Sequence, residues 1–339
     1  MKTVDGARGE GGGQVARVAL SLAAATRVPV RVTNLRANRE QPGLKAGHLA
    51  AFRALAQLCD GEIDGAQLGS REVTLRPGVV TGGEYEFAIE TAGPVSLLLQ
   101  ALLPAMAASR QRFSLTLRGG TNVAWAPQWD DLVLVHAPLL AKLGIDVTPT
   151  LVKRGYFPQG GGEVRVEVET PALRRVAMEE AGPLRRLRAV VSSHGLPRHV
   201  MERAMIGVGE LRQEAPLEVE QDFHRGPGTG MAVALAAECA HTVLGADAVG
   251  RKGVRVEDVV GPAVVALRAE LRSGAGVDVH QADQLPIFMA LAGGGSFTAR
   301  HLTPHAHTVL DLLPEFLPVR VTTQAQERRT RVVIEAGAT

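Results

Sequence analysis

Hydrophobic and polar positions along this chain follow two spacings. Apolar residues that recur every three or four positions predict helices. These helical stretches are 48–58, 94–109, 129–143 and 307–316. Alternating or Val-rich runs over 147–169 and 319–336 predict strand hairpins. The most apolar stretch, 94–109, includes Gln100 and Pro104 and is too short to cross a bilayer, so it is expected to be a buried helix. An α/β chain without a membrane span is predicted.

One arrangement of these elements occurs three times. A glycine-rich or polar entry leads into a helix that opens near a glutamine, and then into a strand that ends in polar residues. The three units are 10–38, 92–122 and 282–305, and each continues into a second helix and a hairpin. The glutamines at their helix starts are Gln14, Gln100 and Gln284. The second interval between them is 98 residues longer than the first, which predicts an insertion.

The extra residues have a natural place after the polar stretch 170–184. The new elements are a strand at Leu187, a helix from about Arg198, a strand near Leu217 and a strand and helix within 230–273. Insertion of a domain at an exposed loop is tolerated by many folds. We therefore expect a large domain of residues 1–180 (repeats one and two) and 276–339 (repeat three), with a smaller α/β domain at 181–275. A single irregular α/β chain without true repeats is the alternative.

Composition excludes several protein classes. The 339 residues are 45% hydrophobic and 21% charged, which is typical of a globular protein. A net charge of +2 excludes a uniformly basic nucleic-acid coat protein. Cys59 and Cys239 lie 180 residues apart and form no disulfide framework, and the start MKTVDGARGE has no signal-peptide pattern. A reducing, cytoplasmic location is expected.

The basic residues are unevenly distributed. The chain has 32 Arg and 5 Lys, and residues 1–60 hold nine of these against four acidic residues. Arg17, Arg36 and Arg39 lie near the glycine-rich segment GEGGGQ (9–14), which precedes a helix. Glycine amides at a helix start favour phosphate, and Glu10 within the segment is a natural ligand for Mg²⁺ or Mn²⁺. A flexible turn with solvated arginines would explain the same pattern.

Three further motifs could have either a catalytic or binding role or a purely structural one. The histidines of ARHLTPHAHT (His301, His305 and His307) fit a metal site, a nucleophilic imidazole or polar loop residues. The stretch HQADQ (280–284) could stack on a base and hold an amine, a hydroxyl or a metal, or could simply begin a helix. The segment RGYFPQGGGEV (154–164) predicts a hairpin with unusual backbone demands.

In order, these motifs resemble those of the RNA 3′-terminal phosphate cyclase family, over essentially the whole chain. The segments that carry the resemblance are DGARGEGGGQVAR, LRANREQPGLKAGH, RGYFPQGGGEV, GLPRHVMER, RGPGTGM, ADQLPIFMALAGGG and HLTPHAHT. The resemblance implies three repeats like the C-terminal domain of translation initiation factor 3, with one inserted domain. It also implies ATP-dependent conversion of an RNA 3′-phosphate to a 2′,3′-cyclic phosphate. Covalent histidinyl-AMP and RNA-adenylate intermediates are implied as well.

The resemblance also assigns residues. It implies His305 as the nucleophile, Glu10 as the metal ligand, and His280 and Pro127 as packing for the adenine, to which nearby Trp125 is expected to add. The implied ATP- or phosphate-binding positions are Arg17, Arg36, Arg39, Gln100, His280, Gln281, Ala282, Asp283 and Gln284. Three positions depart from the family pattern, namely His280 in place of a tyrosine, Gly47 in place of a glutamine and Val309 in place of an asparagine.

Two other functions remain as alternatives. A non-catalytic RNA-binding or ribosome-assembly factor uses the same scaffold but lacks the histidine, so His305 together with Glu10 and Gln100 favours the enzyme. A transferase of the enolpyruvyl group shares the repeat idea but does not explain RGYFPQGGGEV. The oligomeric state and the physiological RNA are not predicted.

Overall fold

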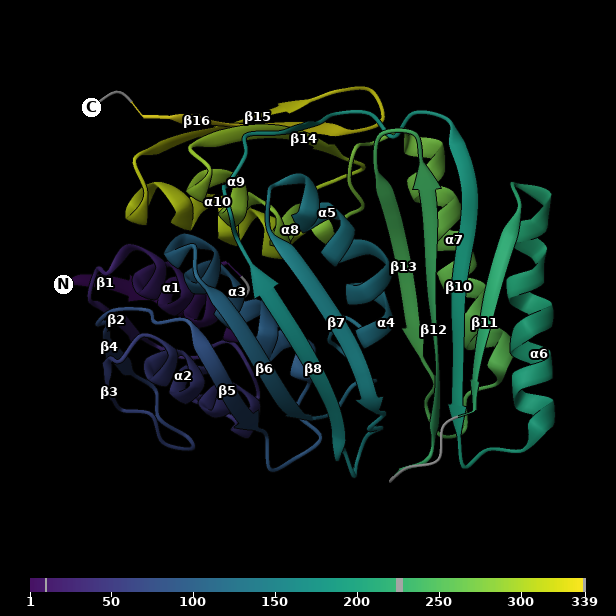
Figure 1. The fold of residues 1–339 in the computed structure, drawn as a ribbon, viewed down its shortest axis with the longest axis horizontal. Helices are drawn as coiled ribbons and strands as arrows, with labels where there is room; N and C mark the ends of the chain where they lie inside the picture. The colour runs from purple at the N-terminus through teal and green to yellow at the C-terminus, as the bar shows by residue number, and fades with distance from the viewer. Residues whose placement is uncertain (10, 224–227, 338–339) are drawn as a thin grey trace.

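The computed structural model describes residues 1–9, 11–223 and 228–337. Its strands form four sheets of four strands each (Figure 1). In three of these sheets the first strand is parallel to the second, the second is antiparallel to the fourth, and the fourth is antiparallel to the third. Each of these sheets belongs to a unit with the order β–α–β–α–β–β, so the repeated arrangement predicted from the sequence is present.

The elements of the three units follow this order. The first unit contains β1 (Lys2–Asp5), α1 (Gly13–Thr26), β2 (Val30–Thr33), α2 (Ala46–Leu58), β3 (Glu62–Asp64) and β4 (Val73–Arg76). The second contains β5 (Gly83–Ala88), α3 (Val95–Ser109), β6 (Arg112–Gly119), α4 (Trp129–Asp131), the π-helical turn η1 (Leu132–His136), α5 (Ala137–Lys142), β7 (Asp146–Lys153) and β8 (Gly162–Glu169). The third contains β9 (Ala177–Met178), α8 (Gln281–Gln284), α9 (Pro286–Leu291), β14 (Gly294–Ala299), α10 (Pro304–Phe316), β15 (Val319–Ala325) and β16 (Thr330–Ala336).

The remaining sheet belongs to a segment that we call the β10–α7 unit (184–273). Its elements are β10 (Leu184–His194), α6 (Arg198–Gly209), the 3-10 helix η2 (Glu210–Gln213), β11 (Leu217–Phe223), β12 (Gly230–Cys239), β13 (Val243–Val249) and α7 (Val256–Ser273). The strand order is β11-β10-β12-β13, and Figure 1 shows α6 and α7 on the same side of this sheet. The strands and helices predicted here are present, and β13 is a further strand that was not predicted.

The structure differs from the sequence predictions in two ways. Each of the three units opens with a strand that hydrophobic patterning did not predict, because β1, β5 and β9 are short or largely polar. The stretch 170–184, expected to be a connection, contains β9, which pairs in parallel with β14. The β10–α7 unit is therefore inserted within the third unit, after β9, the first strand of that unit. The sequence prediction had placed the insertion between the second and third units.

Burial explains why the helices lie between the sheets. Helix α3 is apolar nearly all round and is the most central, and it packs against α1, α2 and α9. The three outer sheets turn alternate residues to solvent, as β7 does along its whole length. A separate buried cluster lies between the β10–α7 sheet and its helices. The division into 1–180, 181–275 and 276–339 stays a prediction. No helix in the described part of the chain has the length and hydrophobicity needed to span a bilayer.

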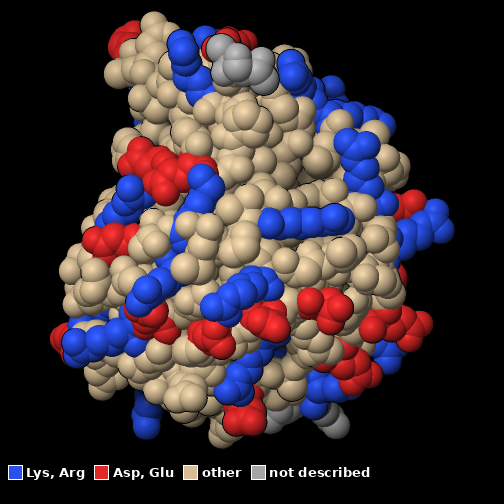
Figure 2. All heavy atoms as spheres, turned by 90° about the vertical axis from the view of Figure 1, so that its left-hand side faces the viewer, with Lys and Arg blue, Asp and Glu red and all other residues tan. Residues whose placement is uncertain are grey.

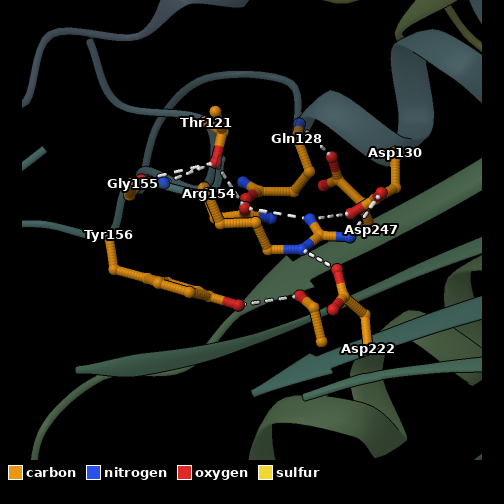
Figure 3. A network of polar contacts seen from close by, with 10 residues as sticks. Thr121, Gln128, Asp130, Arg154, Gly155, Tyr156, Asp222 and Asp247 are labelled. Carbon is orange, nitrogen blue, oxygen red and sulfur yellow. Dashed lines mark hydrogen bonds and ion pairs between the residues drawn. The ribbon is translucent and has the colours of Figure 1, made fainter. Parts of the chain in front are cut away.

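A buried arginine joins the second unit to the β10–α7 unit (Figure 3). Arg154 follows β7 and is only 2% exposed. Its two terminal nitrogens donate to both carboxylate oxygens of Asp130 at 2.7 and 2.9 Å, and its Nε donates to Asp222 of β11 at 2.6 Å. Nearby, the Tyr156 hydroxyl donates to Ser192 of β10 at 2.9 Å. The motif RGYFPQGGGEV thus begins with residues that fix how the two sheets sit together.

Opposite charges are mixed on the outer face of the first unit. Figure 2 shows basic and acidic side chains interspersed on the side where the β1–β4 sheet lies in Figure 1. Several arginines of the first 60 residues are paired, as Arg31 is with Glu72 at 2.8 Å and Arg8 with Glu315. The positive excess of this segment is therefore only partly available to a ligand.

Candidate active site

A cavity of about 670 Å³ opens where the three units meet β13. It brings together ten residues singled out from the sequence, namely Arg17, Arg36, Arg39, Gln100, Pro127, His280, Gln281, Asp283, Gln284 and His305. Ala282 is fully buried in the core and is not part of the lining. Glu10 lies outside the described residues. Residues from all three repeats therefore converge on one concave site, as ligand pockets between structural units often do.

Two helices begin at this cavity. Helix α1 has Gly12 at its N-cap without a side-chain cap, and its first residues, Gly13 and Gln14, line the cavity. A Cβ atom on Gly13 would lie 1.9 Å from Nε2 of His48, so the close approach of α1 and α2 requires glycine there. Helix α10 begins at Pro304, and the Thr303 hydroxyl caps it by accepting from the Ala306 N–H at 3.0 Å. Free N–H groups and helix dipoles at such starts favour anions.

The three histidines of ARHLTPHAHT differ in position. His305 is the second residue of α10, is partly buried and lines the cavity. His301 and His307 are exposed and are not part of that lining. Among the described residues, no group of three or more His, Cys, Asp or Glu side chains could hold a metal ion. The geometry thus separates His305, which faces the cavity, from its two neighbours.

The basic end of the cavity comes from the first unit. Burial lowers the pKa of Arg17, against the opposing effect of the Asp283 carboxylate. Arg36 has left-handed backbone (φ 55°) and donates from Nη1 to the carbonyls of Gln41 and Gly43 at 2.7 and 2.9 Å. These bonds fix its guanidinium and use part of its donor capacity. Burial, together with the charges of Arg17, Arg36 and Lys45, lowers the pKa of His48 to about 4. The region is therefore strongly positive and suited to phosphate.

The opposite end is built by the segment around α8. Asp278 accepts from the backbone N–H groups of His280 and Gln281 at 3.0 and 2.9 Å, and from that of Gly245 in β13 at 2.9 Å. This carboxylate thereby fixes the start of α8 against the β10–α7 unit. Burial raises the pKa of Asp283 to about 6. His280 is exposed and lines the same cavity. Pro127 also lines it, and the Pro127 carbonyl accepts a hydrogen bond from Ser96 Oγ at 2.8 Å.

A much smaller cavity of about 30 Å³ adjoins the first and shares Arg17, Gln100 and Asp283 with it. Gln100 and His136 both line it, and Oε1 of Gln100 and Nε2 of His136 are buried without a hydrogen-bond partner in the described part of the chain. His136 lies in the π-helical turn, and its Nδ1 is 2.7 Å from Oε1 of Gln281. If Nδ1 carries the proton, Nε2 is an acceptor. One water molecule fits this volume and could donate to both orphan acceptors.

We expect a pH-dependent contribution of His136 to stability. Burial lowers its pKa to about 4, so between pH 6.5 and 4 the unfolded chain binds a proton that the folded chain excludes. Stability that is fully present above pH 6.5 is lost as the pH falls through this range, by up to about 3 kcal/mol. Urea unfolding of wild type and His136→Asn should give a free-energy difference that changes in this direction between pH 7 and 4.5. A difference that stays constant over this range would contradict the expectation.

Only a few carboxylates among the described residues of the cavity could help to hold a divalent metal ion. Mg²⁺ is usually held by one or two carboxylates together with substrate phosphates, not by a complete protein cage. Asp131, Asp247 and Asp283 line the cavity, and burial raises the pKa of each, so they are poorly suited to act alone. The described residues therefore fit a metal only as supporting ligands beside a phosphate and a further carboxylate.

Sequence reasoning missed several lining residues. Asp131, Asp247 and Arg251 belong to no recognisable motif, and Asp247 and Arg251 come from the β10–α7 unit. His48 is the last residue of the motif LRANREQPGLKAGH and lines the cavity, but it was given no role. Nothing in the sequence indicates that β13 forms a wall of the cavity, since this depends on packing between distant segments.

Comparison with known proteins gives a consistent result. The sequence profile described as RNA 3′-terminal phosphate cyclase matches residues 8–323. A protein of that name from Nitrosospira multiformis is 42% identical over 339 residues, covering 98% of this chain and 96% of its own. Proteins of the same name from Ectopseudomonas mendocina and Methanopyrus kandleri are 39% and 40% identical, covering 96% of this chain and 96% and 95% of theirs. The chain belongs to the RNA 3′-terminal phosphate cyclase family.

Proposed function

We propose that this protein converts an RNA 3′-phosphate end to a 2′,3′-cyclic phosphate at the expense of ATP, in RNA processing or repair. The observation that carries the proposal is the convergence of His305, three arginines and two helix starts on one cavity. The names of the relatives support the same reaction. Two buried cysteines without a disulfide support a cytoplasmic location.

The proposed first step uses His305 as the nucleophile. Its unprotonated ring nitrogen attacks the α-phosphorus of ATP, an N–P bond forms, the bond to the bridging oxygen breaks, and pyrophosphate leaves. Covalent catalysis of this kind divides one difficult displacement into easier ones. Arg17, Arg36 and Arg39 are proposed to hold the phosphate oxygens, helped by the N–H groups at the helix starts.

Two further displacements complete the proposed reaction. An oxygen of the RNA 3′-phosphate attacks the histidinyl-AMP phosphorus, which frees His305 and joins AMP to the RNA end. The adjacent 2′-hydroxyl then attacks the 3′-phosphorus, loses its proton and expels AMP, leaving the cyclic phosphate. Bound Mg²⁺ or Mn²⁺ would offset phosphate charge, with Glu10 as the proposed ligand.

The other assigned residues bind and orient the nucleotide in this proposal. Pro127 and His280 flank the adenine, and the stretch 280–284 with Gln100 contacts the nucleoside. Ala282 takes part only through its backbone and packing, because its side chain lies in the core. Asp283, with a pKa near 6, can change protonation close to neutral pH and can hold a hydroxyl in either state.

The test is direct. Purified protein is incubated with ATP, Mg²⁺ or Mn²⁺, and RNA labelled at a 3′-phosphate. We expect the label to become resistant to phosphatase, with one AMP formed per end. RNA that ends in a 3′-hydroxyl is the matched control and should remain unchanged. RNA that binds but keeps a phosphatase-sensitive end would instead favour a non-catalytic RNA-binding factor on this scaffold.

A further inference from the structure

Trp125 has a solvent exposure and a backbone conformation that are unusual for a tryptophan. Its side chain is 94% exposed, whereas the other tryptophan, Trp129, is 1% exposed. Its backbone has φ 66°, a left-handed conformation that bulky residues rarely adopt. It also lines the cavity that holds His305. An exposed indole on strained backbone is retained only where surrounding structure imposes it, and such residues cluster at ligand sites.

The loop that carries Trp125 is held by hydrogen bonds on both sides. Nε2 of Gln128 donates to the carbonyls of Val123 and Ala126, each at 3.1 Å. The Gln128 backbone N–H donates to Asp247 of β13 at 2.8 Å, and Ser96 Oγ of α3 donates to the Pro127 carbonyl at 2.8 Å. The loop is thus tied to two units, and the exposed indole stands on a preorganised support.

A cation from another segment lines the same cavity. Arg251 follows β13 in the β10–α7 unit and is exposed. Within residues 1–9, 11–223 and 228–337 it has no ion pair, unlike Arg255, which pairs with Asp258 at 2.9 Å. An aromatic face together with an unpaired arginine is the combination by which proteins hold single-stranded nucleic acid, through base stacking and a phosphate contact.

We propose that Trp125 stacks on a nucleobase of the RNA strand near its 3′ end, and that Arg251 contacts a backbone phosphate of that strand. This rests on the proposed function, in which RNA enters the cavity. This departs from the expectation drawn from the sequence, in which Trp125 helps to pack the adenine of ATP; the adenine is assigned here to Pro127 and His280 alone. Trp125 presents nearly its whole surface to solvent, so it could contact an RNA strand that continues away from the cavity. An adenine held within the cavity would need a more enclosed platform.

Intrinsic fluorescence tests the proposal without depending on turnover. Trp129 is buried, so acrylamide should quench mainly Trp125. We expect a 3′-phosphorylated oligonucleotide to protect this emission from quenching, and we expect ATP alone to leave it accessible. Protection by ATP and not by the oligonucleotide would overturn the proposal in favour of an adenine platform. Accessible emission with saturating oligonucleotide bound, measured independently by anisotropy, would also overturn it.

Variants separate stacking from folding and from the first chemical step. Trp125→Gly removes the ring and relaxes the left-handed backbone, so it should fold at least as well as wild type. It should weaken oligonucleotide binding roughly 5- to 100-fold, while Trp125→Tyr should lose much less. Ile206→Ala, at another exposed apolar residue (73%) on α6, is the matched control and should change nothing.

The measurements also distinguish failure of this proposal from failure of the proposed function. Labelling of the protein by α-labelled ATP should be equal in wild type and Trp125→Gly, because the platform acts on RNA alone. Arg251→Gln should reduce the salt dependence of oligonucleotide binding by about one phosphate contact. Equal oligonucleotide affinity of wild type and Trp125→Gly would refute the stacking role, whether or not the protein cyclises RNA.

Discussion

Replacing His305 by alanine is expected to abolish both labelling of the protein by α-labelled ATP and cyclisation of RNA ends. If His305 forms the covalent bond to AMP, alanine removes the attacking ring nitrogen, because His307 on the same helix does not line the cavity. Loss of an essential nucleophile commonly costs at least about 10³-fold in rate. In the wild type the label should be acid-labile and alkali-stable, as expected of an N–P bond. Labelling is measured after denaturing electrophoresis.

The neighbouring histidines provide the control for this prediction. His307 lies two residues later on the same helix and is exposed, so His307→Ala should retain the label and the cyclase activity. Melting temperatures of both variants would show that each is folded. Wild-type levels of labelling in His305→Ala would refute the nucleophile assignment, and a loss confined to His307→Ala would move it to that residue.

Replacing Arg154 by leucine is expected to cause the largest loss of stability. Its guanidinium is 2% exposed and holds the carboxylates of Asp130 and Asp222, so the variant leaves buried negative charge without a partner. Burial alone would lower the pKa of Arg154, yet the carboxylates outweigh it and raise that pKa, so the pair is strongly stabilised in its charged form. Breaking such a pair costs about 3–5 kcal/mol. Denaturant unfolding measures the loss.

An exposed pair on the same sheet serves as the comparison. Arg112 is 81% exposed and pairs with Glu169 at 2.8 Å, so Arg112→Leu should change stability by less than about 1 kcal/mol. Arg154→Leu should also impair binding at the cavity, because the network fixes Asp130 beside the loop that carries Pro127. Equal stability of the two variants would contradict a structural role for the buried network.

Local patterns predicted those parts of the fold that local physics determines. Helix α3 is apolar on most of its surface, and the hairpin β7–β8 alternates regularly, so both were predicted closely. Strand β9 was not, because it has two residues and depends on pairing with β14. The turn at His136 was predicted as continuous helix, since spacing alone does not distinguish a π-helical turn from an α-helix.

The site was predictable to a similar extent. Ten predicted residues line one cavity because they lie at helix starts and strand ends, where the sequence signal is strong. Asp247 and Arg251 reach the cavity only through the packing of the β10–α7 unit against the second unit, which no local pattern records. The environment of Trp125 also depends on bonds from Gln128 and Ser96, which come from different elements.

The place where the chain leaves the third unit affects the order of assembly during synthesis. The Thr298 hydroxyl donates a hydrogen bond to the carbonyl of Glu179, which lies 119 residues earlier. The sheet that contains β9 therefore cannot form until the C-terminal part of the chain has been synthesised. The first two units and the β10–α7 unit can each form their sheet during synthesis, because domains generally fold as units from the N-terminus. Helices α8 and α10, which bring Asp283 and His305, are made after all of these units. An incomplete nascent chain therefore carries the arginine end of the cavity but lacks the proposed nucleophile, so the potential for chemistry appears only with the finished protein.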